Sequence, residues 1–238
     1  PREKDLKNVS YIRVLGGDHI RITNSDVFSS ATHGIAFDNS PDGAVLTNTV
    51  TSAAAHGIAI LGQSHRTRAV SNTVRANAHG LLVRESDNVT VERNVISSNT
   101  GDGIDVEMAS GTTVRENTVR ANQYGLFLDN ATSGVSVNQN QFCYNTGKDV
   151  YSNSSGASGD NNTCSFLYRW SDAGVTNRCT TDCVGWYSMK WGFSFHNPST
   201  DNLSWTRYEQ TFGEDEVEVT IKICAGVPVC IPFYKCYC

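Results

Sequence analysis

Three histidines recur at equal intervals in the first half of the chain. His33, His56 and His79 each stand directly before a glycine, 23 residues apart, and Asp102 follows at the same interval. Residues one period apart in a repeating structure lie on top of one another, so these side chains are expected to form one column. Stacked imidazoles can bind copper or zinc, and a neighbouring carboxylate favours their charged form. The alternative is a polar ladder of packed rings without a ligand.

The same interval governs the apolar residues. The runs GIAF, GIAI, GLLV, GIDV and GLFL begin at Gly34, Gly57, Gly80, Gly103 and Gly125, and the same step reaches Tyr11 and Gly147. The units are short β-prone runs broken by Asn, Gly, Ser and Asp, without the 3.6-residue amphipathic pattern of helical repeats. The sequence therefore predicts an all-β fold, a parallel β-helix of about seven coils of ~23 residues over residues 1–151.

Alternation along each run predicts which side chains are inside. Residues one and three after each glycine are expected in the core, namely Ile35/Phe37, Ile58/Ile60, Leu81/Val83, Ile104/Val106 and Leu126/Leu128. The residues between them are expected outside, namely Ala36, Ala59, Leu82, Asp105, Phe127 and Asp149. The column before the glycines is expected to contain Ser10, His33, His56, His79, Asp102, Tyr124 and Thr146.

Asparagines recur in two further columns. One is predicted from Asn24, Asn48, Asn72, Asn94, Asn117 and Asn140, and the other from Asn77, Asn99, Asn122 and Asn145. Asparagine tolerates left-handed backbone angles at turns and hydrogen-bonds to identical residues stacked above and below it. We therefore expect structural asparagine ladders at the corners of the coils.

The repeat resembles the right-handed β-helix family that includes NosD-type proteins, pectate lyases, polygalacturonases and alginate epimerases. NTGDGIDV (99–106) resembles the NTDGID motif of polygalacturonases, and HGIAI resembles their GHGISI. That resemblance implies that Asp102 or Asp105 is a catalytic carboxylate and that His56 or His79 is a site histidine. In this chain, however, each His-Gly pair precedes the aspartates, and no two aspartates are adjacent.

The spacing of the carboxylates also bears on catalysis. Glycoside hydrolysis needs two carboxyl groups roughly 5 to 9.5 Å apart. Asp102 and Asp105 are three residues apart on an extended strand, roughly 10 Å, and alternation disfavours their convergence. A lyase or epimerase would need a base and a charge neutraliser, for which the only concentration is Arg84, Glu85, Asp105, Glu107 and Asp129. This group is expected to be a calcium or sugar surface, or a solvated face. These missing parts favour a function without catalysis.

The cysteines indicate an oxidising compartment. All eight lie in the last 96 residues, at Cys143, Cys164, Cys179, Cys183, Cys224, Cys230, Cys236 and Cys238. Their spacing does not match a zinc knuckle, so we expect disulfides, with Cys143 bonded to one of the other seven. Residues 152–163 are predicted to be a Gly/Ser/Asn linker or loop, and residues 164–238 a small cysteine-rich β domain. Six sequons agree with secretion, at Asn8, Asn88, Asn130, Asn153, Asn161 and Asn202.

The net charge and the hydropathy of the sequence limit the classes of binding partner that we expect. The formal net charge is −5, and no apolar run reaches the ~20 residues of a membrane span, so we expect neither nucleic acid nor a transmembrane segment. The first hypothesis is a secreted structural protein of a prokaryotic cell envelope that polymerises into a sheath, surface layer or filament. The second is a carbohydrate-active enzyme or polysaccharide-binding rod. The third is a NosD-like protein that handles copper or zinc through His33, His56 and His79.

Overall fold

A computed structural model describes residues 9–183 in full. It also describes five short strand segments by their backbone alone, at 3–4, 187–194, 205–212, 221–224 and 230–233. Residues up to Cys183 form one compact unit, and Val184–Cys238 form a second. The predicted disulfide residues Cys224, Cys230, Cys236 and Cys238 and the sequons Asn8 and Asn202 have no side chains among the described residues.

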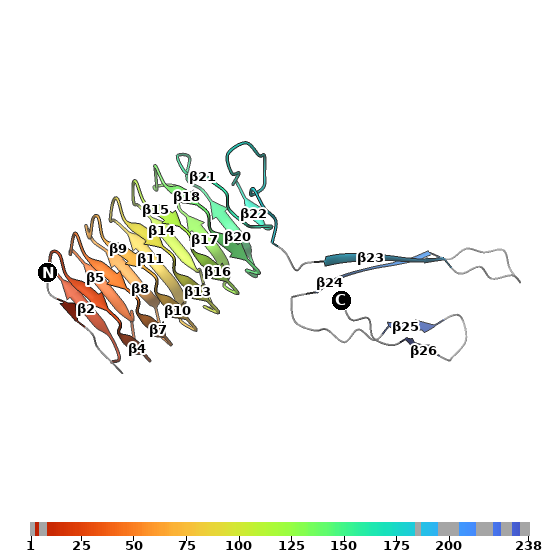
Figure 1. Cartoon of the computed structure of the whole chain (residues 1–238), viewed down its shortest axis with the longest axis horizontal. Coiled ribbons are helices and arrows are strands. Elements are labelled where there is room, and N and C mark those ends of the chain that lie inside the picture. The colour runs from red at the N-terminus through yellow and green to blue at the C-terminus, as the bar shows by residue number, and fades with distance from the viewer. Residues whose placement is uncertain are drawn as a thin grey trace, which may run out of the picture. The chain divides into compact units, whose positions relative to one another are not determined.

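The first unit is a coil of three parallel sheets (Figure 1). Sheet A contains β1 (Glu3–Lys4), β3 (Arg21–Thr23), β6 (Ala44–Leu46), β9 (Arg68–Val70), β12 (Thr90–Glu92), β15 (Thr113–Arg115), β18 (Ser136–Asn138) and β21 (Ser158–Asp160). Sheet B contains β4 (Asp26–Phe28), β7 (Thr49–Thr51), β10 (Thr73–Arg75), β13 (Val95–Ser97), β16 (Thr118–Arg120) and β19 (Gln141–Cys143). Sheet C contains β2 (Ile12–Leu15), β5 (Ile35–Asp38), β8 (His56–Leu61), β11 (His79–Arg84), β14 (Ile104–Glu107), β17 (Tyr124–Leu128), β20 (Lys148–Ser152) and β22 (Leu167–Tyr168).

This architecture confirms the predicted all-β parallel β-helix. Every pairing within the three sheets is parallel, with partners 22 to 24 residues apart along most of the rod, such as Ile58 with Leu81. The predicted core residues fill the interior, and Ile35, Ile58, Leu81, Ile104 and Leu126 are fully buried. The column glycines are required because a Cβ at Gly80 would overlap the carbonyl oxygen of Gly103 in the next coil.

Each coil turns its corners with left-handed residues. Non-glycine residues with positive φ recur at the corners of the coils, and most of them are directly followed by a buried polar residue. For example, Glu116 (φ 54°) precedes Asn117, and Ala121 (φ 55°) precedes Asn122. The strained residue is thus the one before the asparagine, whereas the sequence had placed the left-handed backbone at the asparagine itself. Asn24 is the exception, because it has positive φ and Ser25 occupies the ladder position beside Asn48.

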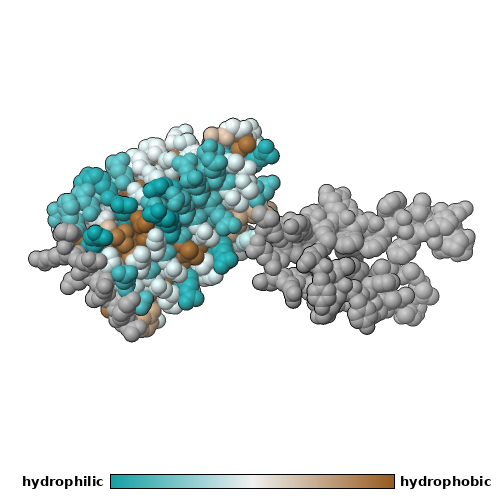
Figure 2. Space-filling view, in the orientation of Figure 1, coloured by the Kyte–Doolittle hydropathy of each residue, from teal (hydrophilic) through white to brown (hydrophobic). Residues whose placement is uncertain are grey.

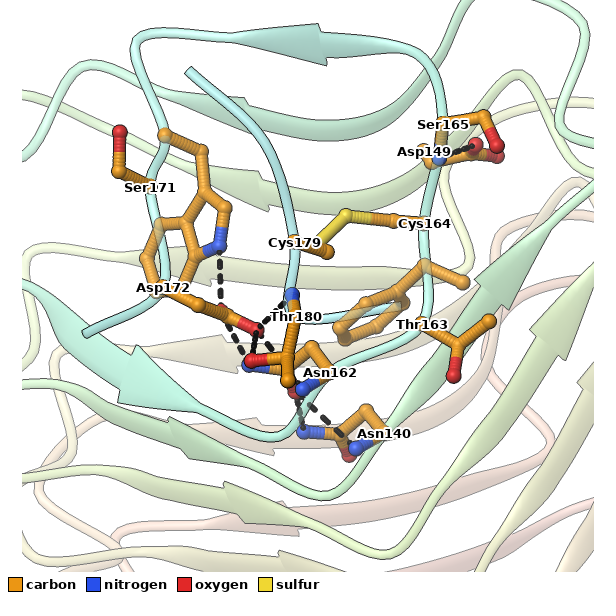
Figure 3. The surroundings of a disulfide bond; sticks show 12 residues. Asn140, Asp149, Asn162, Thr163, Cys164, Ser165, Ser171, Asp172, Cys179 and Thr180 are labelled. Carbon is orange, nitrogen blue, oxygen red and sulfur yellow. Dashed lines mark hydrogen bonds between the residues drawn. A yellow bond between two sulfur atoms is a disulfide. The ribbon is translucent and has the colours of Figure 1, made fainter. Parts of the chain in front are cut away.

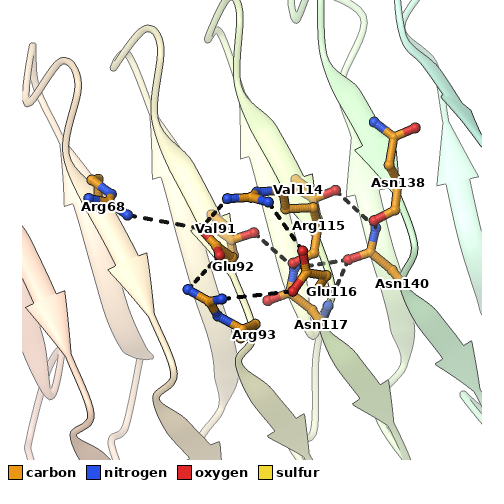
Figure 4. Close-up of polar contacts among 10 residues, drawn as sticks. All are labelled: Arg68, Val91, Glu92, Arg93, Val114, Arg115, Glu116, Asn117, Asn138 and Asn140. Carbon is orange, nitrogen blue, oxygen red and sulfur yellow. Dashed lines mark hydrogen bonds and ion pairs between the residues drawn. The ribbon is translucent and has the colours of Figure 1, made fainter.

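The asparagines after these corners form continuous ladders, one of which appears in Figure 4. Asn117 donates its backbone N–H and one Nδ2–H to Oδ1 of Asn140, at 3.0 and 2.9 Å. Its other Nδ2–H bonds to the Val91 carbonyl at 2.9 Å. The first ladder runs through Asn48, Asn72, Asn94, Asn117, Asn140 and Asn162, and the second through Asn77, Asn99, Asn122 and Asn145. Buried amides are fully paired in this way.

An aspartate terminates each ladder. Every rung directs N–H donors at the next coil, so the last rung needs an acceptor that has nothing to donate. Asp172 accepts the backbone N–H and Nδ2–H of Asn162, as well as the Thr180 N–H and the Trp170 Nε1–H (Figure 3). Asp149 ends the second ladder in the same way, on Asn145.

The end of the rod corrects three sequence predictions. Val150 pairs with Leu126, so Asp149 aligns with Gly125, is fully buried, and is not an outward residue. Tyr124 pairs with Lys148, which takes the place predicted for Thr146. The coils also continue past residue 151, because β21 lies within the predicted linker and β22 beyond it. The shortened, irregular last coil hid this continuation from a projection at constant period.

Two disulfides fasten this end of the rod. Cys143 bonds to Cys183, and Cys164 bonds to Cys179 (Figure 3). They close loops with sequence separations of 40 and 15 residues, and such crosslinks typically stabilise a fold by about 2 to 4 kcal/mol each. The prediction that Cys143 pairs with a cysteine of the C-terminal region is confirmed.

The second unit contains two antiparallel pairs. β23 (Tyr187–Ser194) pairs with β24 (Trp205–Phe212), and β25 (Ile221–Cys224) pairs with β26 (Cys230–Phe233). All four strands lie within residues 164–238, the range in which the sequence predicted a small cysteine-rich β domain.

We expect Asp172→Asn to destabilise the rod by about 1 to 3 kcal/mol at pH 7, because an amide NH2 would face N–H donors. Burial would raise the pKa of Asp172, but hydrogen bonds from Asn162 and Thr180 outweigh it and lower the pKa. A lowered pKa gives stability that is present above about pH 4 and lost as the pH falls through the folded value. The difference in urea midpoint between the natural protein and Asp172→Asn should therefore be smaller at pH 3 than at pH 7. The exposed Asp182→Asn is the matched control and should change neither midpoint.

Candidate functional site

The outer face of sheet C carries three columns of side chains. The middle column follows the strand register and contains Arg13, Ala36, Ala59, Leu82, Asp105, Phe127, Tyr151 and Tyr168. The column at the start of the strands contains His33, His56, His79, Asp102, Tyr124 and Lys148. The column at their ends contains Leu15, Asp38, Leu61, Arg84, Glu107 and Asp129. We call these three columns the sheet C stripe.

The middle of the stripe is apolar. Ala36, Ala59 and Leu82 are at most 5% exposed, because neighbouring columns and coils cover them. Figure 2 shows a hydrophobic (brown) area over the part of the rod where β8 and β11 lie, bordered by hydrophilic side chains. The stripe therefore has an apolar centre between two polar margins.

The three histidines form the predicted column. The ring centroids of His33 and His56 are 5.3 Å apart, and those of His56 and His79 are 4.9 Å apart. Nδ1 of His33 accepts the His56 backbone N–H at 3.4 Å, and Nδ1 of His79 accepts the Asp102 N–H at 3.1 Å. In both rings Nδ1 is thus an acceptor, which leaves Nε2 as the donor. Burial, and then the adjacent His79 and His33, lower the pKa of His56 to about 3.

This geometry is that of a stacked ladder. Among residues 9–183 and the other described segments, no three His, Cys, Asp or Glu side chains are placed to hold one metal ion. The structure therefore does not bring His33, His56 and His79 together as one coordination site. Copper or zinc on this column would have to use Nε2 atoms, because backbone N–H groups occupy Nδ1 of two rings.

Four charged residues converge beside the column. Asp102 lies before β14, where its carboxylate is 3.8 Å from Nδ1 of His79, and Arg84 forms an ion pair with Glu107. Burial, Glu107 and Asp102 together raise the pKa of Asp105 to about 8, so this side chain is neutral at pH 7. Burial also raises the pKa of Asp102. Asp102 lies at the corner before β14 (Ile104–Glu107), and the expectation that alternation keeps its carboxylate apart from that of Asp105 stays a prediction.

Asp105 is an unusual residue for this position. It is only 6% exposed, lies between Leu82 and Phe127 in the register of the middle column, and its Oδ1 has no hydrogen-bond partner. A buried polar atom without a partner is costly, and strongly perturbed acids concentrate at functional sites. Asp105 therefore marks the stripe as a candidate functional site. The catalytic roles that the resemblance implied for Asp102 and Asp105 have no further support, and they stay predictions.

Aromatic rings continue the stripe beyond Asp105. Phe127 stacks on Tyr151 with centroids 5.4 Å apart and planes 9° apart, and Tyr151 stacks on Tyr168 at 4.6 Å and 14°. Tyr124 lies 5.2 Å from Tyr151. Sequence reasoning missed Tyr151 and Tyr168, because it placed Asp149 in this column. The alternating run KDVYS contained the signal, since shifting it by two residues puts Val150 inside and Tyr151 outside.

A second polar cluster lies on the outer face of sheet A (Figure 4). Glu92 is 1% exposed and pairs with Arg93 at 2.6 Å and Arg115 at 2.8 Å, with Arg68 at 4.0 Å. Arg93 and Arg115 also pair with Glu116. These mutual pairs satisfy the charges within the cluster, so we regard it as a brace between coils.

Four sequons lie among the described residues. Asn88, Asn130 and Asn161 are exposed and Asn153 is partly exposed, so all four can meet solvent. Glycosylation of these residues stays a prediction.

We expect Asp105→Asn to stabilise the protein increasingly as the pH rises. A carboxyl whose pKa is raised to about 8 in the folded state holds its proton between pH 4 and 8, whereas the unfolded chain releases it. Stability of the natural protein therefore falls across this window, on the order of 1 kcal/mol per pH unit at most, and the amide avoids this loss. The urea midpoints of the natural protein and of Asp105→Asn, measured from pH 4 to 9, should separate progressively up to pH 8. Above pH 8 the difference between them should stay constant. A constant offset, or equal separation for the exposed Asp18→Asn, would contradict the assignment.

Solved structures with a similar fold are known. The A-module of mannuronan C-5 epimerase AlgE6 from Azotobacter vinelandii has a TM-score of 0.53 and 18% identity, covering 63% of this chain and 39% of that one. The AlgE4 A-module from the same organism has a TM-score of 0.50 and 14% identity, and the match covers 69% of this chain and 58% of that one. Tailspike protein 3 of bacteriophage CBA120 has a TM-score of 0.51 and 12% identity, and the match covers 82% of this chain and 38% of that one. At these identities the likeness is one of fold alone, and this chain spans less than two thirds of each neighbour.

One of the two sequence comparisons gives a match. No curated protein matches the chain in sequence. Within the described residues, the structure contains no helix long and apolar enough to cross a membrane. The family described as "Right handed beta helix region" matches residues 10–164, which include most of the three sheets. The chain therefore belongs to the right-handed β-helix family.

Proposed function

We propose that the sheet C stripe binds an extended polysaccharide that runs along the rod. The observation that carries this proposal is the row of stacked aromatic rings in the middle column, Phe127, Tyr151 and Tyr168, which lies between two columns with hydrogen-bonding groups. Eight strands spaced at about 4.8 Å give the stripe a length of about 34 Å. A linear polymer is the ligand whose shape matches so long and narrow a surface.

The chemistry of a sugar chain matches the three columns. Pyranose rings have apolar C–H faces and hydroxyl-bearing edges, and sugar sites accordingly combine apolar or aromatic contacts with a few fixed polar groups. Phe127, Tyr151 and Tyr168 provide apolar contact in the middle column. His79, Arg84 and the acids beside them provide donors and acceptors at the margins.

The fold holds these groups in advance of binding. Backbone pairing fixes the spacing of the columns, and the stacked rings at the end of the stripe restrict one another. Fixed side chains lose little conformational entropy when a ligand binds, so ordering the site reduces the binding free energy only slightly.

Two further findings support the proposal. The neighbours AlgE6 and AlgE4 are named as epimerases of mannuronan, a polysaccharide, although the likeness is in fold only. The two disulfides fit an oxidising, extracellular compartment where polysaccharides are available. The stripe thus favours the carbohydrate function over the self-assembling sheath, surface layer or filament that was the first hypothesis from sequence.

We expect Tyr151→Ala to weaken polysaccharide binding about tenfold or more, because it removes the centre of the ring stack. The measurement is affinity electrophoresis of the full chain in gels that contain xylan, mannan, a soluble β-glucan or mannuronan. At least one of these should retard the natural protein.

Phe28→Ala is the matched control, because Phe28 is also an exposed aromatic residue, 44% exposed, but lies on β4 in sheet B. It should leave retardation unchanged. If no polysaccharide retards the natural protein, or if the Phe28 variant loses as much affinity as the Tyr151 variant, the stripe is not the binding surface.

A further inference from the structure

A hollow of about 480 Å³ opens at the other end of the stripe from the aromatic stack. It is lined by Tyr11, Arg13, Thr32, His33, Ala36 and Asp38, together with Ile12 and Leu61. The hollow exists because alanine occupies the middle column at Ala36, where the far end of that column has Phe127, Tyr151 and Tyr168. Its size lies in the usual range of small-ligand pockets.

The lining groups are those that recognise a sugar ring. Nη2 of Arg13 pairs with Oδ2 of Asp38 at 2.7 Å, which fixes donors and an acceptor side by side. Nδ1 of His33 faces the backbone of the next coil, so Nε2–H is the donor of that ring. Tyr11 is 63% exposed and offers an aromatic surface at the rim. Vicinal hydroxyls pair well with such combined donor and acceptor groups.

The hollow has no net charge. Arg13 and Asp38 neutralise each other, and burial, followed by the effect of Arg13, lowers the pKa of His33 and keeps that ring neutral. An acidic sugar would place its carboxylate near Asp38, and the one cation among the lining residues, Arg13, is already paired with Asp38. An uncharged sugar meets neither repulsion nor an unpaired charge.

The charges of the rest of the stripe also favour an uncharged ligand. Its cations are Arg13, Arg84 and Lys148, and its ionised carboxylates are Asp38, Asp102, Glu107 and Asp129, which leaves one net negative charge with Asp105 neutral. Two of the three cations are already paired, Arg13 with Asp38 and Arg84 with Glu107. A polyuronate would therefore meet a surface of its own sign.

We propose that the hollow is a subsite for one uncharged pyranose residue, and that the stripe selects a neutral polysaccharide over a polyuronate. The inference rests on the proposed function and deepens it by naming the class of glycan. Tyr11 and Leu61 contact the ring, while Arg13, Asp38 and His33 bind its hydroxyls.

The test compares two chains that differ in their carboxylates, mannohexaose and hexamannuronate, with cellohexaose and xylohexaose as further uncharged probes. Calorimetry with the full chain at low salt should show at least one uncharged hexasaccharide binding about tenfold more tightly than hexamannuronate. Arg13→Ala/Asp38→Ala removes both charges together, leaves neither unpaired, and should weaken that binding about tenfold.

Arg66→Ala/Asp42→Ala is the matched control. Arg66 and Asp42 form an ion pair of the same length, 2.7 Å, with similar exposure, and lie away from sheet C. This control should bind like the natural protein, and both double variants should unfold at similar urea concentrations. Tighter binding of hexamannuronate, or unchanged binding by Arg13→Ala/Asp38→Ala, overturns the subsite even where Tyr151→Ala still loses polysaccharide. Absence of binding to every polysaccharide overturns the proposed function itself.

Discussion

Hydrogen bonding between stacked asparagine side chains is the interaction on which this molecule depends. A coil of about 23 residues must turn sharply, and left-handed residues such as Glu116 and Ala121 make some of those turns at a cost of about 1 kcal/mol each. The asparagines that follow two of the turns donate to the coils above and below them, which offsets the strain and leaves no ladder amide unpaired. Because a ladder of donors must end, Asp172 and Asp149 close it, and the disulfides hold that end in place.

The ladders also determine what the surface can do. They fix the register of the coils, so residues one period apart lie in straight columns about 4.8 Å apart. On sheet C this places small, aromatic and polar side chains in three parallel rows, with a hollow where alanine replaces an aromatic ring. Asp105 is an exception among the residues of these rows, since an apolar residue in its place would pack without leaving a buried oxygen unpaired. Such a residue is better explained by function than by stability.

The sequence predicted the regular part of this architecture well. Strict spacing of Gly57, Gly80 and Gly103 reveals the coil, because only glycine tolerates the close approach of neighbouring coils. The stacking of His56 on His79 follows from the same periodicity. The last coil was misplaced because its irregular length hides the register of Asp149 and Tyr151. The burial of Asp105 could not be predicted, since alternation placed this side chain on the outer face and does not describe how the neighbouring columns cover it.

The central claim is that an uncharged sugar chain lies lengthwise on sheet C. The most direct measurement is a crystal structure of the full chain with the tightest-binding uncharged hexasaccharide. The account predicts sugar density along the middle column, over Leu82, Phe127 and Tyr151, with the chain axis parallel to the rod. Density over the arginine cluster around Glu92 on sheet A, or across the strands of sheet B, would contradict it.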